Sequence, residues 1–219
     1  MDVPLPPIFI VLCGKTGSGK TQVLHHLESS GYPVIDLEKI ASHRGSAFGG
    51  LLLNAQPAQT DFDSEIEKSF LKYDHCTYIF TEHKPSSLGK RKIPGWLYKK
   101  IEQGIFVLLD VDKKRRINNI LGEYKAAGKE GFMNSLHKLK ERLPDTVMKE
   151  CEAFLQSENY YAFIENMLSY YDGTNKYNLR DIDLKIEAGN SNSLEIMHQL
   201  LKNLKQSGAM FLTDPHSAG

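Results

Sequence analysis

Three features of the sequence predict an α/β fold in which a parallel sheet lies between two layers of helices. Apolar strand-like runs alternate with amphipathic helical stretches along most of the 219 residues, as in parallel strands joined by crossover helices. The first run leads into a glycine-rich loop and then a helix. Further helical stretches interrupt the alternation before the last strand. Together these features predict a three-layer P-loop NTPase-like fold with a kinase-like sheet. We expect a single domain at 1–206, a helical insertion at about 112–172 and a disordered tail at 207–219.

The glycine-rich loop follows an unbroken apolar run, Ile8–Cys13, as a strand buried on both faces requires. Apolar residues then recur at helical spacing from Val23 to Leu27. Because strand, loop and helix occur in this order, we interpret the loop as a phosphate site rather than a chance glycine turn. Backbone amides and the helix N-terminus would hold the phosphate. The residues that fit the pattern of a glycine, four residues and Gly-Lys-Thr are Gly14, Lys15, Thr16, Gly17, Ser18, Gly19, Lys20 and Thr21.

Acidic residues follow the next two predicted strands. Asp36 and Glu38 come after a short strand at Val34–Ile35, at the edge where doubly wound sheets bind their ligands. Glu82 follows a β-branched and aromatic strand at Thr77–Thr81, where phosphate-loop enzymes place the carboxylate that orders magnesium or its water. In the loop itself, Lys20 would bridge phosphate oxygens and the Thr21 hydroxyl would hold the metal. The magnesium candidates are therefore Thr21, Asp36 and Glu82.

The segment 41–50 is too rich in glycine to form a regular element. It joins His43 and Arg44 to hydroxyl side chains, including Ser46. This composition suits an anion-binding or substrate loop, although a surface loop with incidental charges has the same composition.

The remaining elements follow from apolar periodicity and from helix and strand signals. Arg116 comes soon after the fourth strand, where an arginine could stabilise charge in the site. We expect residues 83–94 to form a loop. We predict further strands at 105–110 and 182–187, and helices at 61–72 (capped by Thr60 or Asp61), 95–103, 113–124, 131–143, 144–155, 160–171 and 193–206.

Charge is balanced overall, with 27 basic and 27 acidic residues. Basic residues nevertheless gather between Lys84 and Arg142, where 15 Lys/Arg face 6 Asp/Glu. Such a region is either a polyanion-binding face or the solvated surface of helices. The sequence has no apolar run of membrane-spanning length, no signal-peptide pattern and only three widely spaced cysteines. We expect a cytoplasmic protein with no membrane partner; the oligomeric state is open.

On these residues alone the default function is a small-molecule or nucleotide kinase. However, the run DLEKIASHRGSAFG at Asp36–Gly49 closely resembles the signature that follows the phosphate loop in tRNA 2-selenouridine synthases. The resemblance spans roughly 8–186. It continues through 56–59 and Phe62, and it includes Glu82, Leu88–Gly89, Ile93–Pro94, Arg116, Glu123–Tyr124 and Tyr170–Asp172.

The chain departs from this family in two ways. The family usually has a second glutamate and a serine where this chain has Lys84 and Pro85. It also carries an N-terminal rhodanese-like domain with a selenium-handling cysteine, whereas only Met1–Pro7 precede the first strand here. The chain therefore resembles the P-loop half standing alone, and the expected partner is a separate rhodanese-like protein.

The resemblance implies an enzyme that modifies the wobble 2-thiouridine of tRNA. A geranyl group from geranyl diphosphate is first transferred to the sulfur, and selenium from selenophosphate then displaces the geranylthio group. The loop and magnesium would stabilise the departing diphosphate. The implied catalytic residues are Lys20, Asp36, Arg44 and Glu82. The substrate-binding candidates are Glu38, His43, Arg44, Ser46, Gln56, Gln59, Arg91, Arg116 and Tyr171.

The geranyl chain needs an apolar slot, for which Phe48, Leu51–Leu53 and Trp96 are candidates, although each could equally be core. The basic region could bind the tRNA backbone. Tyr170 or Tyr171 could stack on a base or be buried in the fold. A phosphate-loop kinase and a non-catalytic tRNA-binding partner remain the alternative functions.

Overall fold

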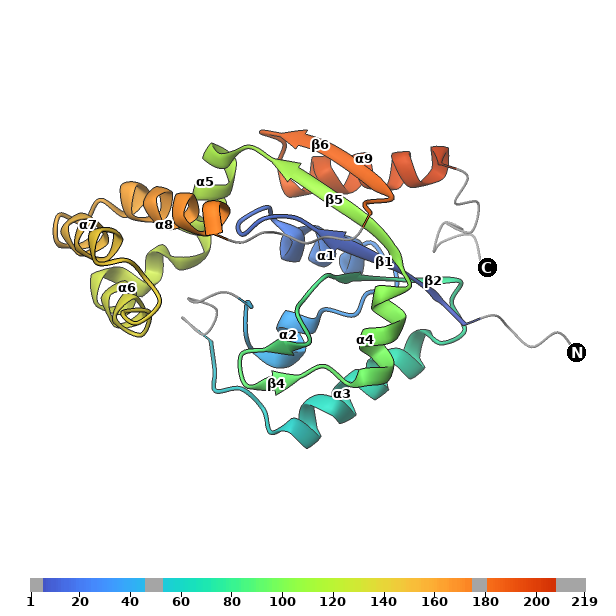
Figure 1. Cartoon of the computed structure of the whole chain (residues 1–219). Coiled ribbons are helices and arrows are strands. Elements are labelled where there is room, and N and C mark those ends of the chain that lie inside the picture. The colour runs from blue at the N-terminus through green and yellow to red at the C-terminus, as the bar shows by residue number, and fades with distance from the viewer. Residues whose placement is uncertain (1–5, 46–52, 175–180, 208–219) are drawn as a thin grey trace, which may run out of the picture.

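A computed structural model describes residues 6–45, 53–174 and 181–207 (Figure 1). The central strand, β1, leads into the glycine loop. Within the described part of the chain, the main sheet is parallel and has the order β2-β1-β5-β6. The predicted parallel α/β fold is confirmed. The strands are β1 (Ile8–Cys13), β2 (Tyr78–Glu82), β5 (Ile105–Val111) and β6 (Leu184–Gly189).

The predicted strand at 34–35 is reduced to one parallel bridge, from Val34 to Phe80 of β2. It ends there because the Asp36 carboxylate accepts a hydrogen bond from the Lys39 amide at 2.8 Å and begins helix α2 (Leu37–Ala41). The segment still lies at the outer edge of β2. On this side of the sheet, β2 therefore lies between β1 and the bridge segment, although the bridge segment comes before β2 in the sequence. This is the kinase-like strand order.

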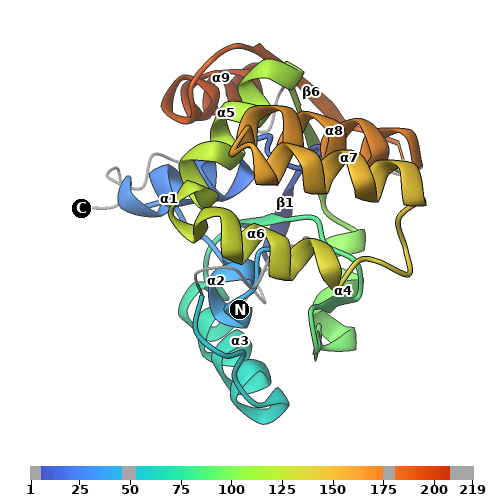
Figure 2. The same cartoon turned by 90° about the vertical axis from the view of Figure 1, so that its left-hand side faces the viewer.

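Helices cover both faces of the sheet (Figures 1 and 2). Successive side chains of β1 point to opposite faces and so pack in two different cores. Ile10 and Leu12 pack in one core, whereas Phe9 and Val11 pack in the other. The helices over the first face are α1 (Lys20–Ser29) and α9 (Ser193–Gln206). Those over the second face are α2, α3 (Gln59–Tyr73) and α4 (Gly95–Glu102).

The predicted helical insertion is confirmed and has an apolar core of its own. It lies beyond the carboxyl ends of the strands (Figure 1). The predicted helix at 131–143 is wrong at its end, because α6 stops at His137 and turns follow. Leu139 and Leu143 still pack in the insertion core, so the helical spacing of apolar residues continues beyond the end of the helix. The insertion consists of α5 (Lys113–Tyr124), the 3₁₀ turn Lys125–Ala127, α6 (Gly128–His137), α7 (Asp145–Gln156) and α8 (Tyr160–Thr174).

Two local predictions are also wrong. The segment 83–94 is not all loop, because β3 (Ser87–Leu88) and β4 (Arg91–Lys92) pair as an antiparallel hairpin. Helix α3 starts earlier than predicted, with Ala58 at its N-cap position, so neither Thr60 nor Asp61 caps it. Hydrogen bonds between the Gln59 side chain and the Lys92 backbone fix this start to the hairpin. Apart from Ser207, the predicted tail lies outside the described residues.

Candidate phosphate-binding site

The glycine loop joins β1 to α1 in a backbone path that only glycine accommodates easily. Gly17 and Gly19 have φ values of 80° and 81°, and Gly19 is the N-cap residue of α1. A Cβ atom on Gly14 would lie 2.9 Å from the Leu109 carbonyl oxygen, and one on Gly17 would lie 2.7 Å from the Arg116 carbonyl oxygen. The loop is therefore fitted closely between the sheet and α5.

The Lys20 side chain turns back across this loop. Its Nζ donates to the Gly14 carbonyl at 2.8 Å and to Ser18 Oγ at 3.2 Å. Burial and, to a smaller extent, the charge of Lys84 lower the pKa of Lys20 to about 8, although nearby carboxylates oppose the shift. Lys20 is thus held where the loop backbone would receive a phosphate group.

A buried network of charged side chains lies behind the loop. Thr21 Oγ1 donates to Glu38 Oε2 at 2.9 Å, and the Glu38 backbone amide donates to Glu82 Oε1 at 3.0 Å. The Lys84 ammonium contacts the Glu38 carboxylate and lies 3.2 Å from Glu82 Oε2. Glu82, Glu38 and Lys84 are 0%, 7% and 9% exposed. The network therefore connects α1, α2 and the end of β2 through largely buried side chains.

The charges of this network depend on burial and on one another. Burial raises the pKa of Glu82 to about 7, with Lys84 opposing the shift and Glu38 adding to it. Burial lowers the pKa of Lys84, but Glu82 and Glu38 together raise it more, so the net shift is upward. Lys84 therefore carries a full positive charge at neutral pH, whereas Glu82 is poised to titrate there.

Asp36 lies at one end of this region and has its own partners. Its Oδ1 accepts from the Lys39 amide, and its Oδ2 lies 3.0 Å from His25 Nε2. The hydrogen bond to Asp36 raises the pKa of His25. Asp36 thus caps α2 and pairs with α1, while Glu38 takes the Thr21 hydroxyl.

The predicted magnesium ligands do not form one coordination site. Thr21 faces Glu38, Glu82 pairs with Lys84, and Asp36 caps a helix. Among the residues that the structure describes, no group of three or more His, Cys, Asp or Glu side chains is arranged to hold a metal ion. The side chains as placed do not fit magnesium.

A cavity of about 580 Å³ opens beside the network, between α1, α2 and the segment after α2. It brings together several predicted residues from separate parts of the chain. The Arg44 guanidinium also lies 5.1 Å from the centre of the Tyr124 ring of α5. Lining residues include Thr21, His25, Asp36, Glu38, Arg44 and Leu53.

Gln56 and Gln59, which are predicted to bind substrate, form hydrogen bonds with the β3–β4 hairpin. The Gln56 side chain donates to the Leu88 carbonyl at 3.0 Å and accepts from the Lys90 amide at 2.8 Å. The Gln59 side chain makes the equivalent pair with the backbone of Lys92, at 2.8 and 2.9 Å. These amides fix the hairpin to the start of α3, and Arg91 lies half-buried on β4.

The segment His43–Gly45 lies between this hairpin and the charged network. His43 Nδ1 accepts from the Gly45 amide at 3.0 Å. Burial lowers the pKa of His43, with Lys84 adding to this shift and Glu38 opposing it. A Cβ atom on Gly89 of the hairpin would lie 2.8 Å from His43 Cδ2. The predicted residue Ser46 lies outside the described residues, as do Phe48, Leu51 and Leu52.

Arg116 of α5 supports the phosphate loop through hydrogen bonds of its side chain. It is 3% exposed, and its Nε donates to the Thr16 carbonyl at 2.8 Å. Its two terminal nitrogens pair with both oxygens of Asp172 on α8, at 2.7 and 2.9 Å. Asn119 of α5 adds a hydrogen bond to the Gly17 carbonyl at 2.9 Å. Arg116 thus positions the loop, a role that sequence analysis missed because its partners lie far along the chain.

The other aromatic candidates lie in or near apolar packing. The rings of Tyr170 and Tyr171 are 5.5 Å apart on α8, beside the insertion core. The Tyr170 hydroxyl donates to the Arg142 carbonyl at 2.8 Å. Trp96 is 36% exposed and meets Phe70 edge to face at 5.1 Å.

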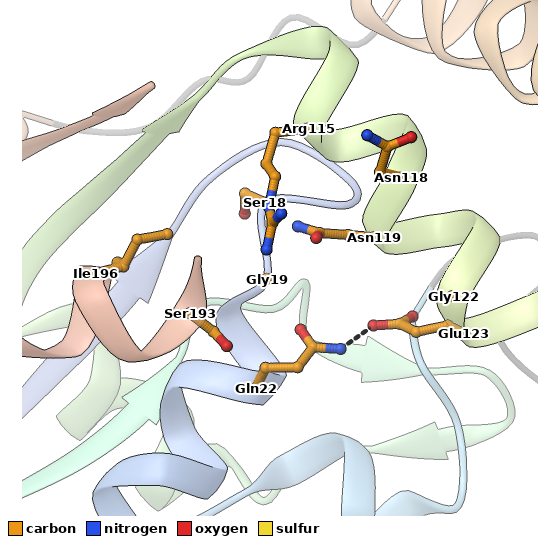
Figure 3. Close-up of a pocket in the computed structure, with 10 residues that line it drawn as sticks. All are labelled: Ser18, Gly19, Gln22, Arg115, Asn118, Asn119, Gly122, Glu123, Ser193 and Ile196. Carbon is orange, nitrogen blue, oxygen red and sulfur yellow. Dashed lines mark hydrogen bonds between the residues drawn. The ribbon is translucent and has the colours of Figure 1, made fainter. Parts of the chain in front are cut away.

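A second, polar pocket of about 400 Å³ lies on another side of the loop, between α1, α5 and α9 (Figure 3). This pocket was not predicted from the sequence. Gln22 of α1 donates to Glu123 of α5 across one end of this pocket. Figure 3 shows Arg115 and Asn119 of α5 reaching toward the loop from the same helix.

Most of the basic region is surface. Of the fifteen Lys and Arg residues between Lys84 and Arg142, two are buried in the site, at Lys84 and Arg116. Ten of the fifteen are exposed: Lys90, Lys92, Lys99, Lys113, Lys114, Lys125, Lys129, Lys138, Lys140 and Arg142.

No helix in the described ranges is long and apolar enough to cross a membrane.

The central β1, the glycine loop at its carboxyl end and the sheet order define a P-loop α/β protein with a kinase-like sheet. A family model described as the tRNA 2-selenouridine synthase AAA domain matches residues 7–207. The chain belongs to this family.

Relatives named tRNA 2-selenouridine synthase match different shares of the chain. The Nitrosomonas eutropha protein is 36% identical over 122 residues, which are 54% of this chain and 31% of that protein. The Pseudomonas putida protein is 38% identical over 118 residues, 53% of this chain and 30% of that protein. The Shewanella oneidensis protein is 27% identical over 227 residues, 89% of this chain and 58% of that protein. The chain thus spans less than two thirds of the length of each.

Similar solved structures include two small-molecule kinases. Shikimate kinase from Acinetobacter baumannii has a TM-score of 0.42 and 15% identity, covering 92% of this chain and 95% of that one. A gluconokinase from Sinorhizobium meliloti has a TM-score of 0.34 and 13% identity, covering 95% and 97%. Likenesses this low say nothing about function.

Proposed function

We propose that this chain is the diphosphate-binding half of a tRNA 2-selenouridine synthase, a tRNA-modifying enzyme. It transfers a geranyl group from geranyl diphosphate to the sulfur of wobble 2-thiouridine and supports its conversion to 2-selenouridine. The observation that carries the proposal is the loop with Lys20 beside a cavity that holds Thr21, Glu38 and Arg44, in a chain of this family.

The proposed reaction depends mainly on stabilising the diphosphate leaving group. A bond forms between sulfur and the first geranyl carbon, the bond from that carbon to the diphosphate oxygen breaks, and the uridine base loses its N3 proton. Negative charge grows on the diphosphate as that bond breaks, so fixed donors aimed at it lower the barrier. Loop amides, Lys20 and Arg44 are the donors that suit this task. Leu53 offers apolar surface in the same cavity.

The later steps need other molecules. Selenium from selenophosphate would displace the geranylthio group, with a separate rhodanese-like protein as the proposed selenium-handling partner. Exposed cations of the insertion would bind the tRNA backbone near the anticodon. We propose that the reaction takes place in the cytoplasm.

A phosphate-loop kinase is the second candidate. The observation that favours it is the polar pocket between α1, α5 and α9, which borders Ser18 and Gly19 of the loop (Figure 3). A nucleotide base in that pocket with its phosphates in the loop would suit phosphoryl transfer.

Nucleoside analysis separates the two. The protein is incubated with thiolated tRNA and geranyl diphosphate, and the digested nucleosides are identified by mass. We expect S-geranyl-2-thiouridine, its loss in Lys20→Ala, and full activity in Lys202→Ala, which alters an exposed lysine on α9. Phosphoryl transfer from ATP without alkylation would favour the kinase.

A further inference from the structure

Lys84 is a buried cation of the basic region, and its partners are two carboxylates of the site. Its side chain is 10% exposed, and those of Glu38 and Glu82 are 7% and 0% exposed. Burying an ammonium group is costly unless opposite charges surround it, and removing one member of such a group leaves an unpaired buried charge. The three side chains therefore have to be considered as one unit.

This unit adjoins the phosphate loop at two points. Glu38 accepts the hydroxyl of Thr21, the last residue of the loop pattern, at 2.9 Å. The charges of Lys84, Glu38 and Glu82 all act on Lys20. Over the unit lies Gly45, where a Cβ atom would sit 3.2 Å from Lys84 Nζ and 3.3 Å from Glu38 Oε1. The backbone thus closes over the ammonium group and leaves little room for a larger hydrated ion.

The two carboxylates without Lys84 would be unfavourable beside a phosphate site. Together they would place up to two negative charges next to a loop that binds anions. They would also resemble a divalent cation site, because carboxylate and hydroxyl oxygens are the ligands that magnesium and manganese prefer. Lys84 meets both needs, since it neutralises the carboxylates and occupies the space between them.

We propose that the Lys84 ammonium is the resident cation of this site and that the loop binds phosphate groups without a divalent metal ion. Lys84 is thus a positioning residue that keeps Glu38 and Glu82 neutralised. The proposal rests on the loop binding phosphate groups, which both candidate functions also require. It does not depend on a particular substrate.

The first experiment titrates Mn²⁺ alone and measures the free ion by electron paramagnetic resonance. We expect weak, non-saturating binding by the wild-type protein. Lys84→Ala should gain a site at least roughly tenfold tighter, because two carboxylates and the Thr21 hydroxyl become available. Adding Glu82→Gln to Lys84→Ala should abolish the gain. Lys90→Ala, an exposed lysine of the same segment, should behave as wild type.

The second experiment measures inorganic pyrophosphate binding by calorimetry in EDTA and in Mn²⁺. Wild-type affinity should be unchanged by EDTA. Lys84→Ala should bind roughly tenfold or more weakly in EDTA, because the carboxylates then repel the ligand, and Mn²⁺ should restore its affinity. Lys84→Arg should keep metal-independent binding.

Three results would overturn the proposal: a tight wild-type Mn²⁺ site lost in Glu82→Gln, wild-type pyrophosphate binding abolished by EDTA, or a folded Lys84→Ala that gains no Mn²⁺ site. The two wild-type measurements test the proposal even if the variants fail to fold. Absence of pyrophosphate binding under every condition would instead refute the phosphate-site function, while the Mn²⁺ titration would still report on Lys84.

Discussion

Glu82 is the residue through which pH acts most directly on this site. Its folded pKa of about 7 lies above the ordinary 4.5, so the folded protein binds more protons than the unfolded chain between these values. Stability therefore falls as pH rises through this window, by about 3 kcal/mol in all. Glu82→Gln removes this contribution. Urea unfolding from pH 4.5 to 7.5 should show wild type losing stability relative to the variant.

The matched control is Glu130→Gln, at an exposed position on α6. Its unfolding free energy should follow wild type across the same pH range. Parallel curves for wild type and Glu82→Gln would show that Glu82 is ionised throughout.

Arg116 joins the loop to the insertion at a single side chain. Arg116→Ala removes the bidentate pair with Asp172 and the bond to the Thr16 carbonyl, so we expect a loss of about 3 kcal/mol of unfolding free energy. Arg116→Lys should recover only part, because an ammonium cannot reproduce the planar fork. Arg142→Ala, which is exposed, should change stability by about 0.5 kcal/mol or less. Equal effects of both alanine variants in urea unfolding would contradict this role.

At the scale of elements, the contact between α5 and the loop is tested by two glycines. Gly17→Ala places a methyl group 2.7 Å from the Arg116 carbonyl in a left-handed conformation, and should cost about 2 kcal/mol. Gly122→Ala, within α5, meets no atom within 4 Å and should stabilise the protein by about 0.5–1 kcal/mol. Thermal unfolding of both variants measures the difference. A neutral Gly17→Ala would mean that the loop moves away from α5 freely.

Most elements could be predicted because their apolar spacing is local. Strand Ile8–Cys13 and helix Ser193–Gln206 have the predicted limits. The failures arise where a distant partner decides the local structure. The hairpin fixes the start of α3 through Gln59 and Lys92, and a carboxylate cap ends the short strand at Asp36.

The same reason limits prediction of the site. Sequence order indicated which loop and which strand ends meet, and the structure brings Thr21, Asp36, Glu38 and Arg44 to one cavity. The pairing of Lys84 with Glu38, 46 positions away, has no local signal. Asp172, the partner of Arg116, is 56 positions away, so apolar periodicity does not predict this pair either.

In the molecule as a whole, two apolar cores flank the sheet and a third fills the insertion. The insertion lies at the carboxyl edge of the sheet (Figure 1). The insertion adds exposed cations to the end of the sheet where the loop lies. If tRNA binds there, Lys138→Glu combined with Lys140→Glu should lower the slope of log affinity against log salt by about 2. Filter binding at several salt concentrations measures this slope.

The control is Lys202→Glu combined with Lys205→Glu on α9, over the opposite part of the molecule from the insertion (Figure 1). It should leave the slope nearly unchanged. A larger effect of the α9 pair would place tRNA on the other side of the sheet.

In the proposed reaction, the phosphate loop holds a diphosphate that leaves from carbon. This step is tested most directly with geranyl diphosphate that carries ¹⁸O in the oxygen between carbon and phosphorus, reacted with thiolated tRNA. We expect the label to appear in pyrophosphate, in amounts equal to the S-geranyl nucleoside formed. Label that stays on the geranyl carbon, or label-free turnover that requires ATP, would contradict this proposal.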